Sequence, residues 1–255
     1  MKKGLHCRCS VGVLVPKTLM FAALIILASS AMAHASSGSA WLARIDQTAR
    51  LAQAHLVLDV TVTDARGRER ARTIEVWQQG DERRLVRLTA PARIAGIGLL
   101  VSPGGQTHLF LPSYPPARRV TGPKRSDAFM GTDFAIEDLS RMTYSGTYTA
   151  TVNGEVDGLT HLILSNVADS GAASPHLWVD AEAVVRRIQH FDDQGQPSRT
   201  LLLSDVRDVG DAQIPHEIQV TDLKRNRITR AKLEQIDVSS DIDTSTFSVT
   251  QLERR

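Results

Sequence analysis

The chain has 255 residues, of which 42% are hydrophobic and 23% are charged, as in ordinary globular proteins. This composition excludes a disordered chain, a collagen-like chain and a protein with many membrane spans. The formal net charge is +2, but residues 1–35 contain four basic residues and no acidic residue. The remaining residues include 26 of the 30 basic and all 28 acidic ones. Because phosphate binding needs a strong basic excess, this balance excludes a nucleic acid as partner.

Residues 1–35 have the three parts of a secretory signal peptide. A basic stretch precedes the apolar run from Leu19 to Ala28, and small residues follow, with possible A-x-A cleavage sites at 31–33 and 33–35. We expect cleavage and not a membrane anchor, because ten apolar residues are too few for a bilayer, which takes about 20. Both cysteines, Cys7 and Cys9, lie in this segment. The mature protein is therefore expected to be free of cysteine and soluble in an oxidising compartment, the bacterial periplasm.

The pattern after residue 35 predicts one helix followed by a series of strands. A helix is predicted over residues 39–54, because apolar residues recur at three- to four-residue spacing after Ser39, a suitable cap. From Leu56 onward, about a dozen short apolar and β-branched runs are separated by turn residues and lack helices between them. This order favours an antiparallel meander in one domain over residues 36–255. Predicted turns include residues 64–67, 79–81, 103–105 and 153–154.

The strand periodicity leaves two architectures open. Some strands alternate cleanly between polar and apolar residues, as strands with one wet face do, whereas others are apolar on both sides. A sheet curved around an apolar interior would show both patterns, and so would an ordinary sandwich.

Residues 112–143 interrupt the strand pattern with four prolines, two basic pairs and a short helical pattern. Asp133 is the predicted cap of this helix, which a stripe of apolar residues marks: Phe134, Ile136, Leu139 and Met142. A helix-bearing segment midway through a meander is where a lid would be inserted. The basic pairs are candidate contacts for an anionic head group or a partner, although a solvated loop gives the same pattern: Arg118, Arg119, Lys124 and Arg125.

Motifs for catalysis or metal binding do not stand out. No two histidines after residue 35 lie within four positions of each other, and no G-x-S-x-G, H-E-x-x-H, Walker or EF-hand pattern occurs. The acidic pairs have local explanations: Asp192-Asp193 favours a hairpin turn, and Glu137-Asp138 favours a helix start. The sequence therefore predicts a protein that is not an enzyme and that has no cofactor and no bound metal.

The most distinctive string is SDAFMGTDFAIEDL, residues 126–139. It resembles the S-F-M-G-S-D-F-S-Y-E-D-L signature of the LolA-like group, a bacterial family of outer-membrane lipoprotein-sorting proteins. Weaker matches flank it, at His108–Pro112 with Arg118-Arg119-Val120 upstream, and at Leu177–Asp180 and residues 242–252 downstream. The resemblance therefore covers nearly the whole chain after residue 35.

The resemblance implies a mainly β (α+β) fold. This fold is an incomplete, strongly curved antiparallel β-barrel, with an N-terminal helix and a short helical lid over a hydrophobic cavity. Members are similar to periplasmic carriers that shield acyl chains on the way to the outer membrane, and some are associated with RND-type exporters. Each methylene that moves from water into such a cavity gains about 0.8 kcal/mol, so an acyl chain can be held without covalent chemistry.

We therefore expect a monomeric periplasmic carrier of a lipid or lipidated protein. An inner-membrane exporter would supply the cargo and an outer-membrane acceptor would receive it. The expected cavity residues come from the central strands and the lid, although core packing is an equally good reason for each: Trp77, Leu99, Leu100, Leu109, Phe110, Phe129, Met130 and Phe134. The alternative is a periplasmic sensor that binds a partner protein, because envelope-stress regulators use a similar domain.

Overall fold

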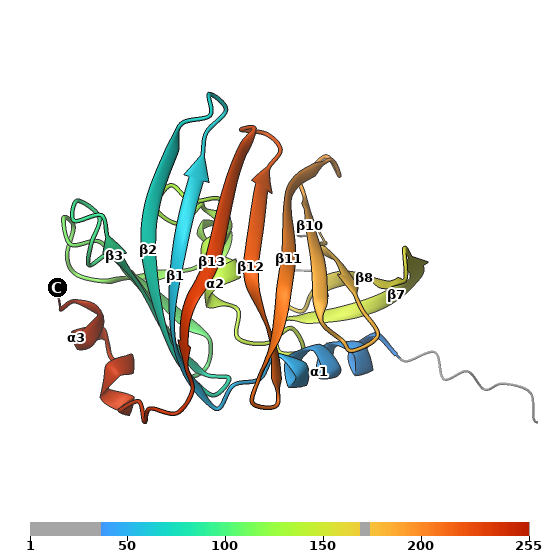
Figure 1. Ribbon diagram of the computed structural model, residues 1–255, viewed down its shortest axis with the longest axis horizontal. Coiled ribbons are helices and arrows are strands. Elements are labelled where there is room, and N and C mark those ends of the chain that lie inside the picture. The colour runs from blue at the N-terminus through green and yellow to red at the C-terminus, as the bar shows by residue number, and fades with distance from the viewer. Residues whose placement is uncertain (1–36, 169–173, 255) are drawn as a thin grey trace, which may run out of the picture. The chain divides into compact units, whose positions relative to one another are not determined.

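The computed structural model describes residues 37–168 and 174–254, and the predicted signal peptide lies outside the described residues. Within this part, thirteen strands form a single antiparallel sheet, accompanied by three α-helices and two short 3-10 helices (Figure 1). None of these helices has both the length and the apolarity needed to cross a membrane. In chain order the elements are α1 (Gly38–Thr48), β1 (Gln53–Thr63), β2 (Glu69–Gln79), β3 (Arg83–Ala90), β4 (Gly98–Ser102), β5 (Gln106–Phe110), β6 (Arg118–Val120), η1 (Gly122–Ser126), α2 (Ile136–Ser140), β7 (Tyr148–Val156), β8 (Leu159–Asn166), β9 (His176–Val179), β10 (Val185–Phe191), β11 (Pro197–Val209), β12 (Ala212–Asp222), β13 (Arg227–Asp237), η2 (Thr244–Phe247) and α3 (Val249–Leu252).

The strand order follows the chain order, with one long-range pairing. Strands β1 to β6 and strands β7 to β13 each pair with their sequence neighbours, and β1 pairs with β13 to join the two runs. The outer strands of the sheet are therefore β6 and β7, which are consecutive in the sequence. The segment between them, residues 121–147, has to cross the open side of the curved sheet. This arrangement confirms the predicted open antiparallel fold and excludes a sandwich of two separate sheets.

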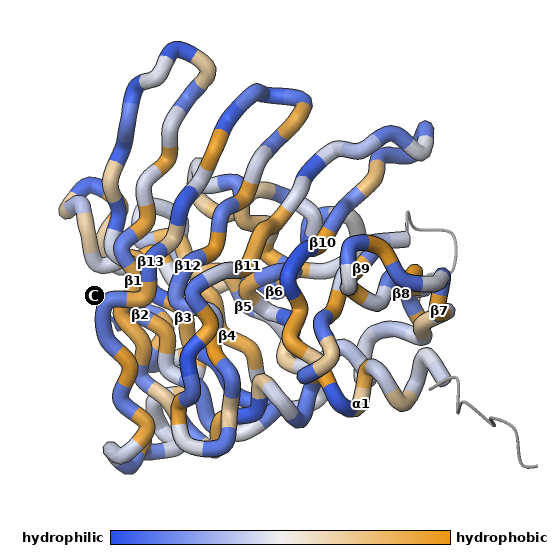
Figure 2. Tube along the Cα trace, turned by 45° about the vertical axis from the view of Figure 1, so that its right-hand side comes forward, coloured by the Kyte–Doolittle hydropathy of each residue, from blue (hydrophilic) through white to orange (hydrophobic). Residues whose placement is uncertain are grey.

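Alternate residues of each strand point to opposite faces of the sheet, and both faces carry apolar side chains. The tube in Figure 2 shows this alternation along the strands, and the far ends of the hairpins are mostly hydrophilic. The larger core lies on the concave face, where α1 contributes Leu42 and Ile45 and the 121–147 segment contributes Phe129, Phe134 and Ile136. Helix α1 and the 121–147 segment therefore cover the concave face of the sheet.

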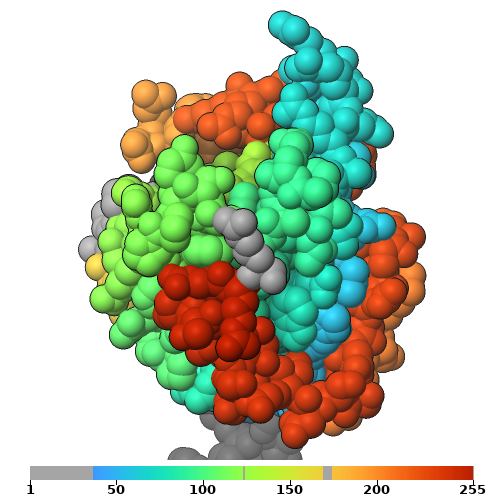
Figure 3. All heavy atoms as spheres, turned by 90° about the vertical axis from the view of Figure 1, so that its left-hand side faces the viewer, coloured from blue at the N-terminus to red at the C-terminus, as the bar shows by residue number. Residues whose placement is uncertain are grey.

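The opposite face of β3 to β5 has a smaller core of its own. The C-terminal segment covers this face, and its residues Ile242, Phe247 and Leu252 pack against side chains of the strands. Figure 3 shows the C-terminal segment, in red, lying against the segments drawn in green and teal. On β3, Arg87 holds the segment in place, because its guanidinium donates to the carbonyl oxygens of Gln251 and Leu252 at 2.8 and 3.2 Å.

Two local predictions need correction. Helix α1 ends at Thr48 and not at residue 54, because strand alternation begins at Gln53 and takes over the apolar residues. Its cap is Ser37, whose hydroxyl accepts the backbone N–H of Ala40 at 3.3 Å.

The predicted turn at 153–154 lies inside β7, where the register with β8 shifts between Val152 and Glu155. The hairpin turn is instead formed by Asp157 and Gly158, whose φ angles of 54° and 75° suit a tight two-residue turn.

Candidate functional site: the lid on the concave face

We call residues 121–147 the lid, and its centre is a tight loop that points two aromatic rings at the sheet. The backbone N–H of Phe129 donates to the carbonyl oxygen of Phe134 at 2.7 Å, and Met130 and Gly131 turn the chain with φ angles of 47° and 75°. The Phe129 and Phe134 side chains are 0% and 5% exposed. The lid thus fills the concave face with its own apolar groups, and Met130-Gly131 form its tip.

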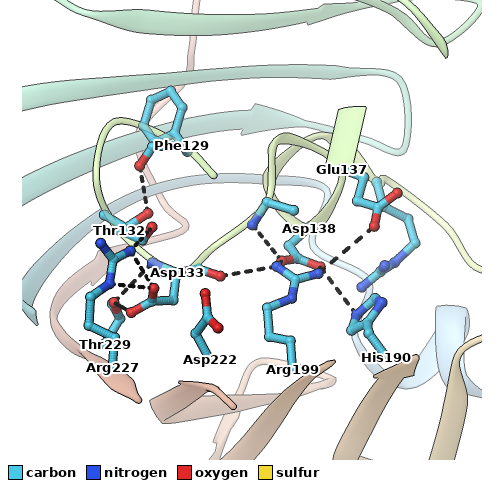
Figure 4. Close-up of polar contacts among 12 residues, drawn as sticks. Phe129, Thr132, Asp133, Glu137, Asp138, His190, Arg199, Asp222, Arg227 and Thr229 are labelled. Carbon is cyan, nitrogen blue, oxygen red and sulfur yellow. Dashed lines mark hydrogen bonds and ion pairs between the residues drawn. The ribbon is translucent and has the colours of Figure 1, made fainter. Parts of the chain in front are cut away.

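The first polar attachment joins the lid to β13. The Asp133 carboxylate is fully buried and accepts hydrogen bonds from the Arg227 guanidinium and, at 2.7 Å, from the Thr229 hydroxyl (Figure 4). The same Thr229 oxygen accepts the backbone N–H of Asp133 at 3.0 Å, and Arg227 also donates to the Thr132 carbonyl at 3.0 Å. Asp133 is therefore not the helix cap that the sequence predicts, because its carboxylate is used by a neighbouring strand.

The second attachment joins the start of α2 to β11. The Asp138 carboxylate, 4% exposed, accepts from Nη1 of Arg199 at 2.5 Å and from the backbone N–H of Ala135 at 2.8 Å. Arg199 also donates to the Asp133 carbonyl oxygen at 3.0 Å (Figure 4). Burial acts to raise the pKa of Asp138, but the charges of Arg199 and Arg141 and the hydrogen bond from the Ala135 N–H together hold that pKa below its ordinary value.

His190 on β10 lies beside this ion pair. Its Nε2 is 3.7 Å from an oxygen of Asp138 and makes no hydrogen bond among the described residues. Burial, together with the charge of Arg199, lowers the pKa of His190 to about 4. The imidazole is therefore neutral at neutral pH, and the positive charge in direct contact with Asp138 is that of Arg199.

The third attachment joins the end of α2 to β3. Nη1 of Arg84 donates to the carbonyl oxygens of Leu139 and Arg141 at 3.0 and 3.1 Å, while the rest of the guanidinium binds the Gln78 side chain. Burial lowers the pKa of Arg84 to about 10, which leaves it charged at neutral pH. The lid is consequently tied to both halves of the sheet, to β3 on one side and to β11 and β13 on the other.

A cavity of about 1560 Å³ lies next to the lid. Residues of the lid and of β6, β7, β10 and β11 line it, and they mix charged, polar and apolar side chains: Arg119, Val120, Arg125, Glu137, Arg141, Tyr148, Phe191 and Arg199. A smaller cavity of about 380 Å³ lies where α1 meets β7, beside Leu42, Tyr148 and Ala150.

The structure divides the eight predicted cavity residues between the two faces of the sheet. Five belong to the concave core: Leu99, Leu109, Phe129, Met130 and Phe134. Three pack on the opposite face with the C-terminal segment: Trp77, Leu100 and Phe110. The division follows from strand geometry, because neighbours along a strand, such as residues 99 and 100, point to opposite sides. None of the eight lines the larger cavity.

The four predicted basic contacts are also divided. Arg119 and Arg125 line the larger cavity, whereas Arg118 and Lys124 are exposed and are not part of its lining. The structure thus leaves only one residue of each basic pair at this cavity.

Sequence reasoning missed the polar attachments because their partners lie far away in the chain. Asp138 and Arg199 are separated by 61 residues, and Asp133 and Arg227 by 94. A helix cap and a helix dipole each explain an aspartate locally, so neither carboxylate suggested a distant partner. The one available signal was the distinctive string at 126–139, which contains both carboxylates.

Two histidines that are far apart in the sequence meet on the outer face of β8 and β9. Nε2 of His161 lies 3.0 Å from Nδ1 of His176, and the His161 ring stacks on Trp178 at 4.6 Å. Within residues 37–168 and 174–254, however, no three His, Cys, Asp or Glu side chains are grouped so that they could hold a metal ion.

Comparison with known proteins identifies the fold and the family. The open curved sheet is shared with solved structures of LolA-like proteins. A family model described as "Uncharacterized protein" matches residues 80–254, and the chain belongs to that family. No curated protein matches the sequence.

Three solved structures share the architecture. One, from Vibrio parahaemolyticus, is described as an outer membrane lipoprotein-sorting protein domain; it is 17% identical, with a TM-score of 0.75 over 85% of this chain and 98% of that one. A DUF1329 family protein from Desulfovibrio piger is 17% identical, with a TM-score of 0.75 over 84% and 97%. A LolA superfamily protein from Nitrosomonas europaea is 18% identical, with a TM-score of 0.71 over 84% and 98%. At these identities the likeness establishes the fold, and it confirms the resemblance that residues 126–139 indicate.

Proposed function

We propose that the protein is a periplasmic carrier that binds acyl chains of a lipid or lipoprotein on the concave face of its sheet. The observation that carries this proposal is the lid, whose apolar side chains fill the concave face while polar contacts hold it in place. A face covered in this way can exchange one apolar occupant for another. The lid then acts as the occupant of the empty carrier, and cargo replaces it.

The free energies of the two occupants favour this exchange. Burial of Phe129, Phe134 and Ile136 stabilises the closed form by about 5–9 kcal/mol, at 1.5–3 kcal/mol for each side chain. An acyl chain of about 15 methylenes gains about 12 kcal/mol on leaving water. The acyl chain therefore gains more free energy than the three lid side chains lose, and this excess offsets part of the cost of breaking the polar attachments. The attachments keep the lid closed when no cargo is present.

The predicted signal peptide supports delivery to the periplasm, and the relative described as a lipoprotein-sorting domain supports transport toward the outer membrane. In this proposal the protein acts as a monomer without a cofactor. It takes its cargo from an inner-membrane exporter and gives it to an outer-membrane acceptor, and each transfer requires the lid to move.

Native mass spectrometry tests the proposal on the full chain, exported to a periplasm and purified without detergent. We expect a mass above that of the processed polypeptide, and the excess should be extractable by organic solvent as lipid. A clean polypeptide mass, together with no uptake of a fluorescent acyl probe, would contradict the carrier function.

Two matched core variants make the test specific to the concave face. Phe134→Ala removes a competitor of the acyl chain, so the probe should bind about tenfold more tightly or better. Leu252→Ala removes a fully buried side chain of the opposite face and should leave the affinity for the probe unchanged. Equal affinities of the two variants would refute the assignment of the concave face.

A further inference from the structure

A buried arginine lies beside the lid tip and takes no part in the lid attachments. Arg72 on β2 points to the concave face, on the same side of its strand as Ile74, and only 6% of its surface is exposed. A Cβ atom on Gly131 would lie 3.2 Å from Nη2 of Arg72, so the tip of the lid passes directly against the guanidinium.

Among the described residues, no carboxylate forms an ion pair with the guanidinium of Arg72. Its one hydrogen bond among the described residues runs from Nη1 to the Arg70 carbonyl oxygen, at a long 3.4 Å. The Nε atom is buried and has no hydrogen-bond partner in the part of the chain that the structure describes. The Nε and Nη2 groups form one of the two edges by which a guanidinium binds an oxyanion with two parallel hydrogen bonds. That edge is free of protein partners in the described part of the chain.

Other positively charged side chains surround the Arg72 guanidinium. Burial lowers the pKa of Arg72, and the charges of Arg93, Arg70 and Arg227 lower it further. Asp133 is the nearby carboxylate that opposes this effect, but its oxygens already accept from Arg227 and Thr229. A buried cation without a partner is costly, and an anion with several oxygens would remove that cost.

We propose that Arg72, with the exposed Arg70 and Arg93, binds the phosphate group of an anionic acyl lipid. This inference rests on the proposed carrier function and names the class of its cargo. The direction of β2 suits such a ligand, because Ile74 and Val76 follow Arg72 on the same face, about 13 Å along the strand by Val76. A phosphate held by Arg72 would therefore place its acyl chain along the concave apolar core, under the displaced lid.

The test compares two acyl probes of equal chain length, palmitoyl lysophosphatidic acid and neutral monopalmitoylglycerol, on the full exported chain. We expect the wild-type protein to bind the phosphate lipid about tenfold more tightly or better, as one or two charge-assisted hydrogen bonds provide. Arg72→Gln should remove this preference while the affinity for the neutral probe is kept. Arg93→Gln, an exposed site that does not endanger folding, should reduce the preference in the same direction.

Arg230→Gln on the far face of β13 changes the net charge equally and should keep the preference. Equal affinity of the wild type for both probes, or an unchanged preference in Arg72→Gln, would overturn the inference while leaving the carrier function intact. Failure of every variant to bind either probe would overturn both.

Inorganic phosphate separates the two sources of the ligand. Stabilisation of the wild type by phosphate, lost in Arg72→Gln and without any preference between the lipids, would assign the site to free phosphate and overturn the lipid cargo.

Discussion

The ion pair between Asp138 and Arg199 provides the sharpest test of how the lid is held. Asp138→Asn keeps the size of the side chain and an oxygen that accepts the Ala135 N–H. It removes the negative charge, however, and leaves the charge of Arg199, whose side chain is only 14% exposed, without its ion-pair partner. Breaking one partner of a buried pair costs about 3–5 kcal/mol. We expect about 3 kcal/mol, because Glu137 lies 3.8 Å from Arg199 and retains part of the attraction. For a domain of this size, that loss lowers Tm by about 9 °C.

Urea denaturation of the full chain at pH 7.5 measures this loss directly, and Asp208→Asn is the matched control. Asp208 is an exposed carboxylate on β11, so its replacement changes the charge equally and should alter the free energy of unfolding by less than about 0.5 kcal/mol. Asp138→Asn should also release a bound acyl probe faster than the wild type, because opening its lid costs less free energy. Equal unfolding free energies for the two variants would refute the role of the Asp138 attachment.

Three further predictions concern pH and the two cores. The pKa of His190 is lowered from 6.5 to about 4 in the folded protein, so the unfolded chain takes up a proton first as the pH falls. Stability should therefore be complete above pH 6.5 and decline by about 3 kcal/mol toward pH 4, and His190→Gln should flatten this part of the urea-midpoint profile. Phe134→Ala should cost about 3–5 kcal/mol of stability in the same assay, and a loss below 1 kcal/mol would contradict its place in the concave core. Leu252→Ala should cost about 2–5 kcal/mol, and limited proteolysis should then cut first in the C-terminal segment.

The sequence by itself determined most of the strands and the kind of fold. Alternating apolar residues and turn residues predicted the strands, and the proline-rich interruption at 112–143 marked the segment that contains most of the lid. The string at 126–139 indicated the LolA-like architecture, which the solved structures confirm. These signals are readable because they depend on neighbours within a few residues of the chain.

Only the tertiary structure decided which residues meet. The pairing of β1 with β13 makes β6 and β7 the outer strands, and for this reason the lid lies over the concave face. The same pairing and curvature bring Arg227 to Asp133 and Arg199 to Asp138, and leave Arg72 buried without an ion-pair partner among the described residues. Periodicity reports which side of a strand a residue occupies but not which distant strand it faces. That choice depends on the sum of many contacts between residues far apart in the chain, and it is made when the sheet assembles.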